Sequence, residues 1–172
     1  VKNNLKDILW LASAYVYLTS SAVALIETRE LSDFGRVAVI WLFVIVWTND
    51  IGAYFFGRTF GSARITPNIS PGKTWVGTIA GLICSGLISL TFSSTFFETK
   101  GIWFITLLAI FIAIIAQVGD FIESLFKRHY DVKDSGTLIP GHGGVLDRGD
   151  SVFLAAPVFF IILVFHFQGV IF

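Results

Sequence analysis

Five long apolar runs, separated by shorter polar segments, make up most of this 172-residue chain. Each run has about the 20 residues that a helix needs to cross the hydrocarbon core of a bilayer. The runs are continuous and do not alternate with a period of two, which favours helices over the strands of a membrane barrel. The pattern therefore predicts an all-α, polytopic membrane bundle of about five transmembrane helices. The expected helices cover Ile8–Ile26, Val37–Gly57, Trp75–Phe97, Ile102–Phe126 and Val152–Phe172.

The composition agrees with this pattern. Hydrophobic residues make up 55% of the chain, charged residues only 14%, and the mean hydropathy is +0.78. Soluble domains carry about 25% charged residues, so these values indicate an integral membrane protein, with residues 1–172 forming a single transmembrane domain. The formal net charge is zero, which argues against nucleic acid as a partner. The single cysteine, Cys84, lies in an apolar run and is expected to be a packing residue.

The polar segments differ in positive charge, and this difference predicts an orientation. With five spans, the N-terminus and the loops at 58–74 and 127–151 share one side of the membrane. Nine basic residues lie on that side and three on the other, so the first side is expected to face the cytoplasm, across the inner membrane if the cell is bacterial. The nine are Lys2, Lys6, Arg58, Arg64, Lys73, Lys127, Arg128, Lys133 and Arg148, and the three are Arg29, Arg36 and Lys100.

Acidic residues interrupt two of the apolar runs. Asp50 lies inside the second run, while Asp120 and Glu123 lie near the cytoplasmic end of the fourth. Ionisable groups at membrane depth are costly and usually face a bundle interior or a wet cavity. Asp120, Glu123 and Lys127 are spaced i, i+3 and i+7, so they share one helix face, with Ser124 beside them. Such a face suits a divalent cation next to a phosphate. In the alternative interpretation the two carboxylates only lie at the membrane interface.

The loop at 58–74 ends in Gly-Lys-Thr but is not a nucleotide-binding P-loop. That motif needs a glycine where this sequence has Pro67, and a strand where it has the end of a membrane span. Ser70, Lys73 and Thr74 offer donors to a phosphate at the start of the third helix, where helix N-termini favour anions. The alternative is a basic loop that only sets the orientation.

The loop at 127–151 is balanced in charge and rich in glycine. An orienting loop would not need its acids, whereas aspartates for a metal and cations for phosphates suit a metal–polyphosphate site. The glycines around His142 allow the backbone to approach a ligand closely. Asp150 and Ser151 have an alternative role as the N-cap of the fifth helix. The loop's charged residues are Lys127, Arg128, Lys133, Arg148, Asp131, Asp134, Asp147 and Asp150.

The segment SLFKRHYDVKDSGTLIPGHGGVLDRGDS resembles the signature of the CDP-diacylglycerol synthase family, also called phosphatidate cytidylyltransferases. The upstream pieces WTNDIGAYFFGR, ISPGKTWVGTIAG and QVGDFIES follow the order seen in this family, so the resemblance covers most of residues 45–155. Gly149 and Val76 depart from it, because the family usually has a larger apolar residue and a polar residue there. Family members usually carry additional N-terminal spans, so this chain looks like the C-terminal catalytic part of a longer architecture.

The resemblance implies transfer of a cytidylyl group from CTP to phosphatidate, giving CDP-diacylglycerol and pyrophosphate, with Mg²⁺ alone or with a second cation. The implied metal ligands are Asp120 and Asp147, with Glu123 and Asp150 as second choices. Lys127 and Arg148 join Asp120 and Asp147 as the implied catalytic residues. Substrate binding is expected from Ser70, Lys73, Ser124, Arg128, Lys133, His142, Gly143 and Gly144. The expected partners are CTP, phosphatidate and the lipid bilayer, and the sequence leaves a monomer and a homodimer open.

Three other functions remain open on the residues alone. A transporter or channel would explain the intramembrane acids Asp50, Asp120 and Glu123, but not four cations and a glycine-rich loop on one side. Another CTP-dependent lipid enzyme, such as a polyprenol kinase or an archaeal-type lipid cytidylyltransferase, would use the same chemistry. The third alternative is an inactive, purely structural module. The motif of the CDP-alcohol phosphotransferases, with its aspartates on one helix, does not occur in this sequence.

Overall fold

The chain forms a bundle of helices in a computed structural model that describes residues 5–66, 69–96, 101–130, 132 and 149–167. The described residues form α1 (Leu5–Glu30), α2 (Gly35–Phe60), α3 (Trp75–Phe96), α4 (Ile102–His129) and α5 (Asp150–Phe167). The predicted all-α membrane architecture is confirmed. Four of these helices, α1 to α4, are long and apolar enough to cross a membrane, whereas α5 is a shorter apolar helix. The described part of α5 agrees with the expected fifth helix up to Phe167, and 168–172 lie outside the described residues.

A short β-hairpin joins α2 to α3 where the sequence predicted a loop. Its strands, β1 (Arg64–Thr66) and β2 (Ser70–Thr74), are antiparallel, with Thr66 opposite Ser70 and Arg64 opposite Thr74. β2 contains Pro71, which a two-stranded sheet tolerates because each strand has an unpaired edge.

The hairpin leads directly into α3 through Thr74. The hydroxyl of Thr74 accepts a hydrogen bond of 3.2 Å from the backbone N–H of Gly77, which makes Thr74 the N-cap of the helix. The N–H of Trp75 donates to the carbonyl oxygen of Ala63 at 3.1 Å, so the first turn of α3 is fixed against the start of the hairpin.

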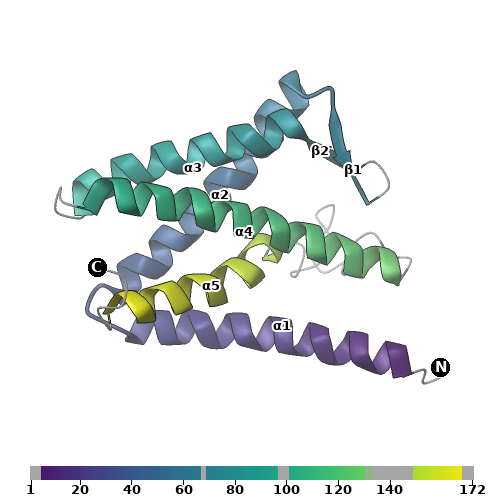
Figure 1. The fold of residues 1–172 in the computed structure, drawn as a ribbon, viewed down its shortest axis with the longest axis horizontal. Helices are drawn as coiled ribbons and strands as arrows, with labels where there is room; N and C mark the ends of the chain where they lie inside the picture. Colours follow the sequence, from purple (N-terminus) through teal and green to yellow (C-terminus); the bar gives the residue numbers. More distant parts are fainter. Residues whose placement is uncertain (1–4, 67–68, 97–100, 131, 133–148, 168–172) are drawn as a thin grey trace, which may run out of the picture.

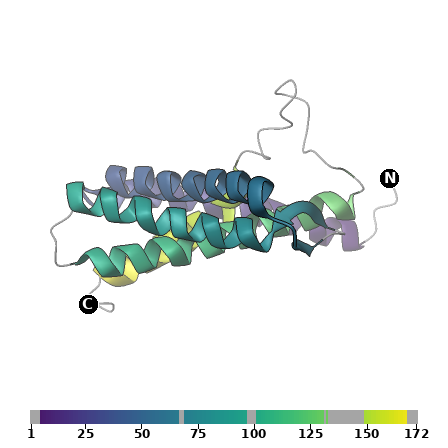
Figure 2. The same cartoon turned by 90° about the horizontal axis from the view of Figure 1, so that it is seen from above.

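The segments predicted to face the cytoplasm gather at one end of the bundle. The start of α1, the hairpin and the end of α4 lie together, and the α1–α2 connection lies at the opposite end (Figure 1). Aromatic contacts join the start of α1 to the end of α4. The ring of Trp10 stacks on His129 with centroids 4.5 Å apart and meets Phe126 edge-on with centroids 4.7 Å apart. Figure 2 shows the bundle from above, with α3 packed against both α2 and α4.

Small residues bring the helices close enough to form the core. Gly77 packs against the backbone of α2, since an added Cβ would lie 2.5 Å from the carbonyl oxygen of Ala53. Gly52 faces Cys84 across the same interface, as expected for a cysteine that serves in packing. Close approach of this kind, rather than burial from water, stabilises helix pairs in a bilayer. The core of the bundle includes Leu42, Ile45, Ala109, Ile112, Ala113, Ala116, Ala155, Ala156 and Phe159.

α5 begins partway along α4 rather than at its end. A Cβ added to Gly119 of α4 would lie 3.1 Å from the carbonyl oxygen of Asp150 and 3.0 Å from the Cβ of Leu154. The first turn of α5 therefore lies against the middle of the bundle, as Figure 1 also shows. This depth brings Asp150 beside groups of α2 and α4.

Candidate functional site

A polar cavity of about 640 Å³ lies between α2, α3, α4, the hairpin and the first residues of α5. Apolar side chains, among them Tyr54, Trp75, Ile114 and Val118, form part of its wall. A cavity with polar groups inside and apolar residues around them suits a ligand that is part lipid and part polar. Its polar lining includes Asn49, Asp50, Ser70, Lys73, Thr78, Gln117, Asp120, Asp150 and Ser151.

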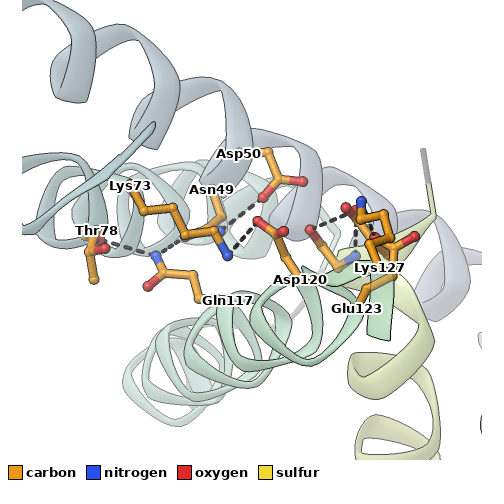
Figure 3. A network of polar contacts seen from close by, with 10 residues as sticks. Asn49, Asp50, Lys73, Thr78, Gln117, Asp120, Glu123 and Lys127 are labelled. Carbon is orange, nitrogen blue, oxygen red and sulfur yellow. Dashed lines mark hydrogen bonds and ion pairs between the residues drawn. The ribbon is translucent and has the colours of Figure 1, made fainter. Parts of the chain in front are cut away.

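An ion pair between Lys73 and Asp120 crosses this cavity. The ammonium nitrogen of Lys73, on β2, lies 2.9 Å from Oδ2 of Asp120, on α4, and 5.8 Å from the centre of the Phe121 ring (Figure 3). The two side chains are 25% and 30% exposed. The structure thus brings together two residues that the sequence had assigned to separate segments. A phosphate that binds Lys73 and a cation that binds Asp120 would both compete with this pair.

The helix face predicted from the spacing of Asp120, Glu123 and Lys127 is shared by two ion pairs. Asp120 turns to Lys73, and one turn further along Glu123 pairs with Lys127 at 3.1 Å. The side chains of the second pair are only 12% and 17% exposed. Glu123 also contacts the carboxyl group of Asp150. Two carboxyl groups this close repel each other unless a proton or a cation lies between them.

The end of α4 also holds the hairpin. Nε of Arg128 donates a hydrogen bond of 3.2 Å to the carbonyl oxygen of Ile69, between the two strands. Of the predicted residues on this helix, Asp120 lines the cavity, and the other four described ones do not. Those four are Glu123, Ser124, Lys127 and Arg128.

Asp150 lines the cavity and does not cap its helix. The carbonyl oxygen of Gly149 accepts the N–H groups of Val152 and Phe153 at 2.9 and 3.1 Å, which makes Gly149 the N-cap and Asp150 the first helical residue. The interpretation of Asp150 or Ser151 as the N-cap is therefore wrong. Oδ1 of Asp150 instead accepts the backbone N–H of Ser151 at 2.8 Å.

Two amides that sequence reasoning missed, the buried Asn49 and the half-buried Gln117, lead to Asp50. Nδ2 of Asn49 donates to Oδ1 of Asp50 at 3.2 Å. Nε2 of Gln117 donates to Oδ1 of Asn49 at 2.7 Å and to the carbonyl oxygen of Thr78 at 3.1 Å (Figure 3). A signal was present in the sequence, because Asn49 directly precedes Asp50 and Gln117 lies three residues before Asp120. Neutral amides inside apolar runs are costly unless they are hydrogen-bonded.

Several predicted residues lie outside the described part of the chain, and the structure places none of them. The two departures from the family pattern are described. Val76 is 39% exposed on the first turn of α3 and does not line the cavity. Gly149 is covered by the ring of Phe153, which an added Cβ would meet at 2.9 Å. The residues outside the description are Lys133, His142, Gly143, Gly144, Asp147 and Arg148.

The described carboxylates offer the oxygen ligands that Mg²⁺ prefers, but they do not complete a ligand set. Asp50, Asp120 and Asp150 line one cavity. Within the described ranges no three acidic, histidine or cysteine side chains lie close enough together to hold a metal ion. A metal at Asp120 or Asp150 would therefore need further ligands, and the sequence proposed Asp147 as one of them.

Comparison with known proteins identifies the family. Residues 2–166 match the model of the cytidylyltransferase family. The phosphatidate cytidylyltransferase of Brucella suis biovar 1 (strain 1330) is 40% identical over 88% of this chain and 56% of its own length. That of Staphylococcus haemolyticus (strain JCSC1435) is 44% identical over 76% of this chain and 50% of its own length. That of Bacillus subtilis (strain 168) is 36% identical over 87% of this chain and 56% of its own length.

The chain spans about half the length of these curated relatives. The match to the family model extends over nearly all of its residues, including the helices and the hairpin that form the cavity. The chain belongs to the cytidylyltransferase family.

Proposed function

We propose that this chain carries the catalytic part of a phosphatidate cytidylyltransferase, which converts CTP and phosphatidate to CDP-diacylglycerol and pyrophosphate. The observation that carries the proposal is the polar cavity inside a bundle of apolar helices, crossed by the Lys73–Asp120 pair. A lipid phosphate needs a site within reach of the membrane, and a triphosphate needs cations. The names of the relatives support the same reaction.

In the proposed reaction a phosphate oxygen of phosphatidate attacks the α-phosphorus of CTP. The new P–O bond forms as the bond from the α-phosphorus to the bridging oxygen breaks, and pyrophosphate leaves with the electron pair. The nucleophile is already an anion, so positioning and charge neutralisation are the main tasks of the protein. Lys73 would exchange its partner Asp120 for a phosphate oxygen, while Lys127 and Arg128 would attract the triphosphate to the end of the bundle.

Mg²⁺, alone or with a second cation, would supply positive charge to the triphosphate when bound. Asp120 and Asp147 are the proposed ligands, with Asp150 and Glu123 as second choices. Of these, the described residues Asp120 and Asp150 line the cavity. Glu123 is held by Lys127 and would have to leave that ion pair in order to bind a metal.

The cavity is proposed to face the cytoplasm, across the inner membrane if the cell is bacterial. This orientation is supported by the excess of basic residues on the segments at that end of the bundle. CTP is a cytoplasmic metabolite, so a cavity that opened to the other side would not meet its substrate. A reporter fused to the C-terminus should lie outside the cytoplasm.

A transfer assay tests the proposal. The full-length protein, purified in detergent with phosphatidate and Mg²⁺, should move label from CTP into the lipid phase. Lys73→Met should reduce this transfer about 100-fold, by analogy with the loss of one preorganised charge-stabilising group. Arg36→Met, which removes an exposed cation at the other end of the bundle, is the matched control and should leave the transfer unchanged.

Three outcomes would overturn the proposal. Transfer of the γ-phosphate of CTP to a polyprenol or diacylglycerol would identify a lipid kinase. Transfer only to an ether-linked lipid acceptor would identify an archaeal-type enzyme. Ion flux in liposomes without any transfer of label would identify a transporter.

A further inference from the structure

We propose that Asn49 and Gln117 are positioning residues for the reaction, because their side-chain amides form a relay that fixes the carboxylate of Asp50 in the cavity. This inference rests on the proposed function. It adds a third cavity carboxylate to those considered for the site, and it assigns a role to two neutral residues.

The relay has one possible direction. Nε2 of Gln117 lies near two oxygens, Oδ1 of Asn49 and the carbonyl of Thr78, so it is the donor to both. Oδ1 of Asn49 must then be the acceptor, which leaves Nδ2 of the same amide to face Asp50. The Asn49 side chain is 0% exposed and cannot exchange these partners for water. Gln117 thereby sets the orientation of Asn49, and Asn49 sets that of Asp50.

The first residues of α5 line the same cavity as Asp50. The hydroxyl of Ser151, a residue only 3% exposed, lies close to the Asp50 carboxylate and donates a long hydrogen bond of 3.4 Å to Oδ1 of Asp150. Ser151 also donates its backbone N–H to Asp150. The carboxylate of Asp50 therefore accepts the Asn49 amide and lies near the first turn of α5, in the cavity wall that also contains Asp120 and Asp150.

Gly81 of α3 lies directly against Asn49. A Cβ added to Gly81 would lie 2.7 Å from Oδ1 of Asn49 and 2.8 Å from the backbone carbonyl oxygen of the same residue, closer than real Cβ atoms approach another atom. Even a methyl group there would displace the Asn49 amide from its position between Gln117 and Asp50. The glycine thus serves both the close approach of α2 and α3 and the position of the Asn49 amide.

A purely structural role for these amides would not need the contact with Asp50. The same α2–α3 interface holds a second buried polar contact, in which the hydroxyl of Ser85 donates to the carbonyl oxygen of Ile45 at 3.2 Å. Ser85 is 0% exposed and does not line the cavity. Both contacts join helices within the bundle, but only the relay ends on a cavity carboxylate. This difference makes Ser85 the matched control.

The test compares turnover and substrate affinity in the full-length protein. Gln117→Met keeps the side-chain length but removes the donor, and Asn49→Asp keeps the shape but sets a second acceptor against Asp50. Each variant should lower kcat about 10-fold or more, with KM for CTP changed less than about 3-fold, because misplaced groups lose rate rather than binding. Ser85→Ala should keep kcat within about 2-fold of the wild type. Thermal unfolding in detergent confirms that each protein is folded.

A double-variant cycle separates positioning from a structural role. If Gln117 acts through Asp50, Gln117→Met should have almost no further effect on kcat in the Asp50→Asn background. If Asp50→Asn leaves too little turnover to measure, Ser151→Ala takes its place in the cycle. The proposed relay would be wrong if the kcat losses of the two single variants multiplied in the double variant. It would also be wrong if the Gln117→Met protein had the kcat of the Ser85→Ala control. A wild-type protein that transfers no label to lipid would instead overturn the proposed function.

Discussion

Two of the cavities between the described helices have opposite chemistry. The polar cavity near the hairpin is lined by acids, amides and Lys73, whereas a smaller cavity of about 250 Å³ towards the α1–α2 connection is lined mainly by apolar and aromatic residues. Trp41 and Phe159 stack in the second cavity with ring centroids 5.4 Å apart. Both are lined by residues of the same three helices, α2, α4 and α5. What distinguishes them is a small number of polar side chains, so the function of this bundle depends on a few positions and its stability on many.

Replacement of Asp120 by Asn should give the largest effect. The variant keeps the shape of the side chain but removes the charge that pairs with Lys73 and the proposed metal ligand. We expect transfer of label from CTP to lipid to fall about 100-fold to 1,000-fold. The pair is partly exposed and contributes little to stability, so the unfolding temperature should change only slightly. Transfer at a near-normal rate would remove Asp120 from the proposed mechanism.

A substitution in the apolar cavity should lower the stability of the protein and leave its turnover unchanged. Phe159→Ala removes a ring that is 2% exposed and stacked on Trp41. Loss of such a side chain costs about 3 kcal/mol of unfolding free energy. Turnover per folded molecule should stay near that of the wild type, measured after the unfolded fraction is removed by gel filtration. A fall in kcat as large as that of Asp120→Asn would show that the two cavities are coupled.

A charge swap tests whether the Lys73–Asp120 ion pair has a functional or only a structural role. Lys73→Asp alone places two carboxylates against each other and should lower the unfolding temperature. Adding Asp120→Lys should restore most of this loss, because the pair forms again in reverse. Turnover should stay low in the double variant, since the cation and the carboxylate would each face the wrong ligand. Recovery of both stability and transfer would mean that the pair only holds the hairpin to α4.

The smallest effect is expected at Val76, one of the departures from the family pattern. Its side chain is 39% exposed on α3 and lies outside the cavity wall. Val76→Gln should change the unfolding free energy by less than about 0.5 kcal/mol, as for other surface substitutions. Transfer should stay within about 2-fold of the wild type. A large gain in transfer would extend the functional surface beyond the polar cavity.

The sequence predicted the helices well because hydropathy is a local property. A run of apolar residues needs no distant partner in order to be helical in a membrane, since its backbone groups must bond within the segment. The hairpin was missed because strands of three and five residues are too short to show a period. The start of the fifth helix was predicted two residues late, at Val152, because the polar residues Asp150 and Ser151 of its first turn do not show the hydropathy of a span.

The contacts of the site depend on distances that one sequence does not contain. Asp50, Lys73 and Asp120 were each noticed as unusual, but nothing local shows that Lys73 reaches Asp120 rather than Glu123. The amide of Gln117 seemed unremarkable because its partners, Asn49 and Thr78, lie on other helices. Residue types thus predicted the chemistry, while the packing of α2, α3 and α4 decided which groups meet.

The start of α5 deep in the bundle has an electrostatic consequence. Gly119, against which α5 begins, lies ten residues before the end of α4, or about 15 Å along that helix. The N-terminus of a helix carries about half an elementary positive charge. Here that charge is built into the backbone, beside Asp150 and the cavity that Asp50 and Asp120 also line. It offsets part of the negative potential before any ligand binds, and no side-chain substitution can remove it.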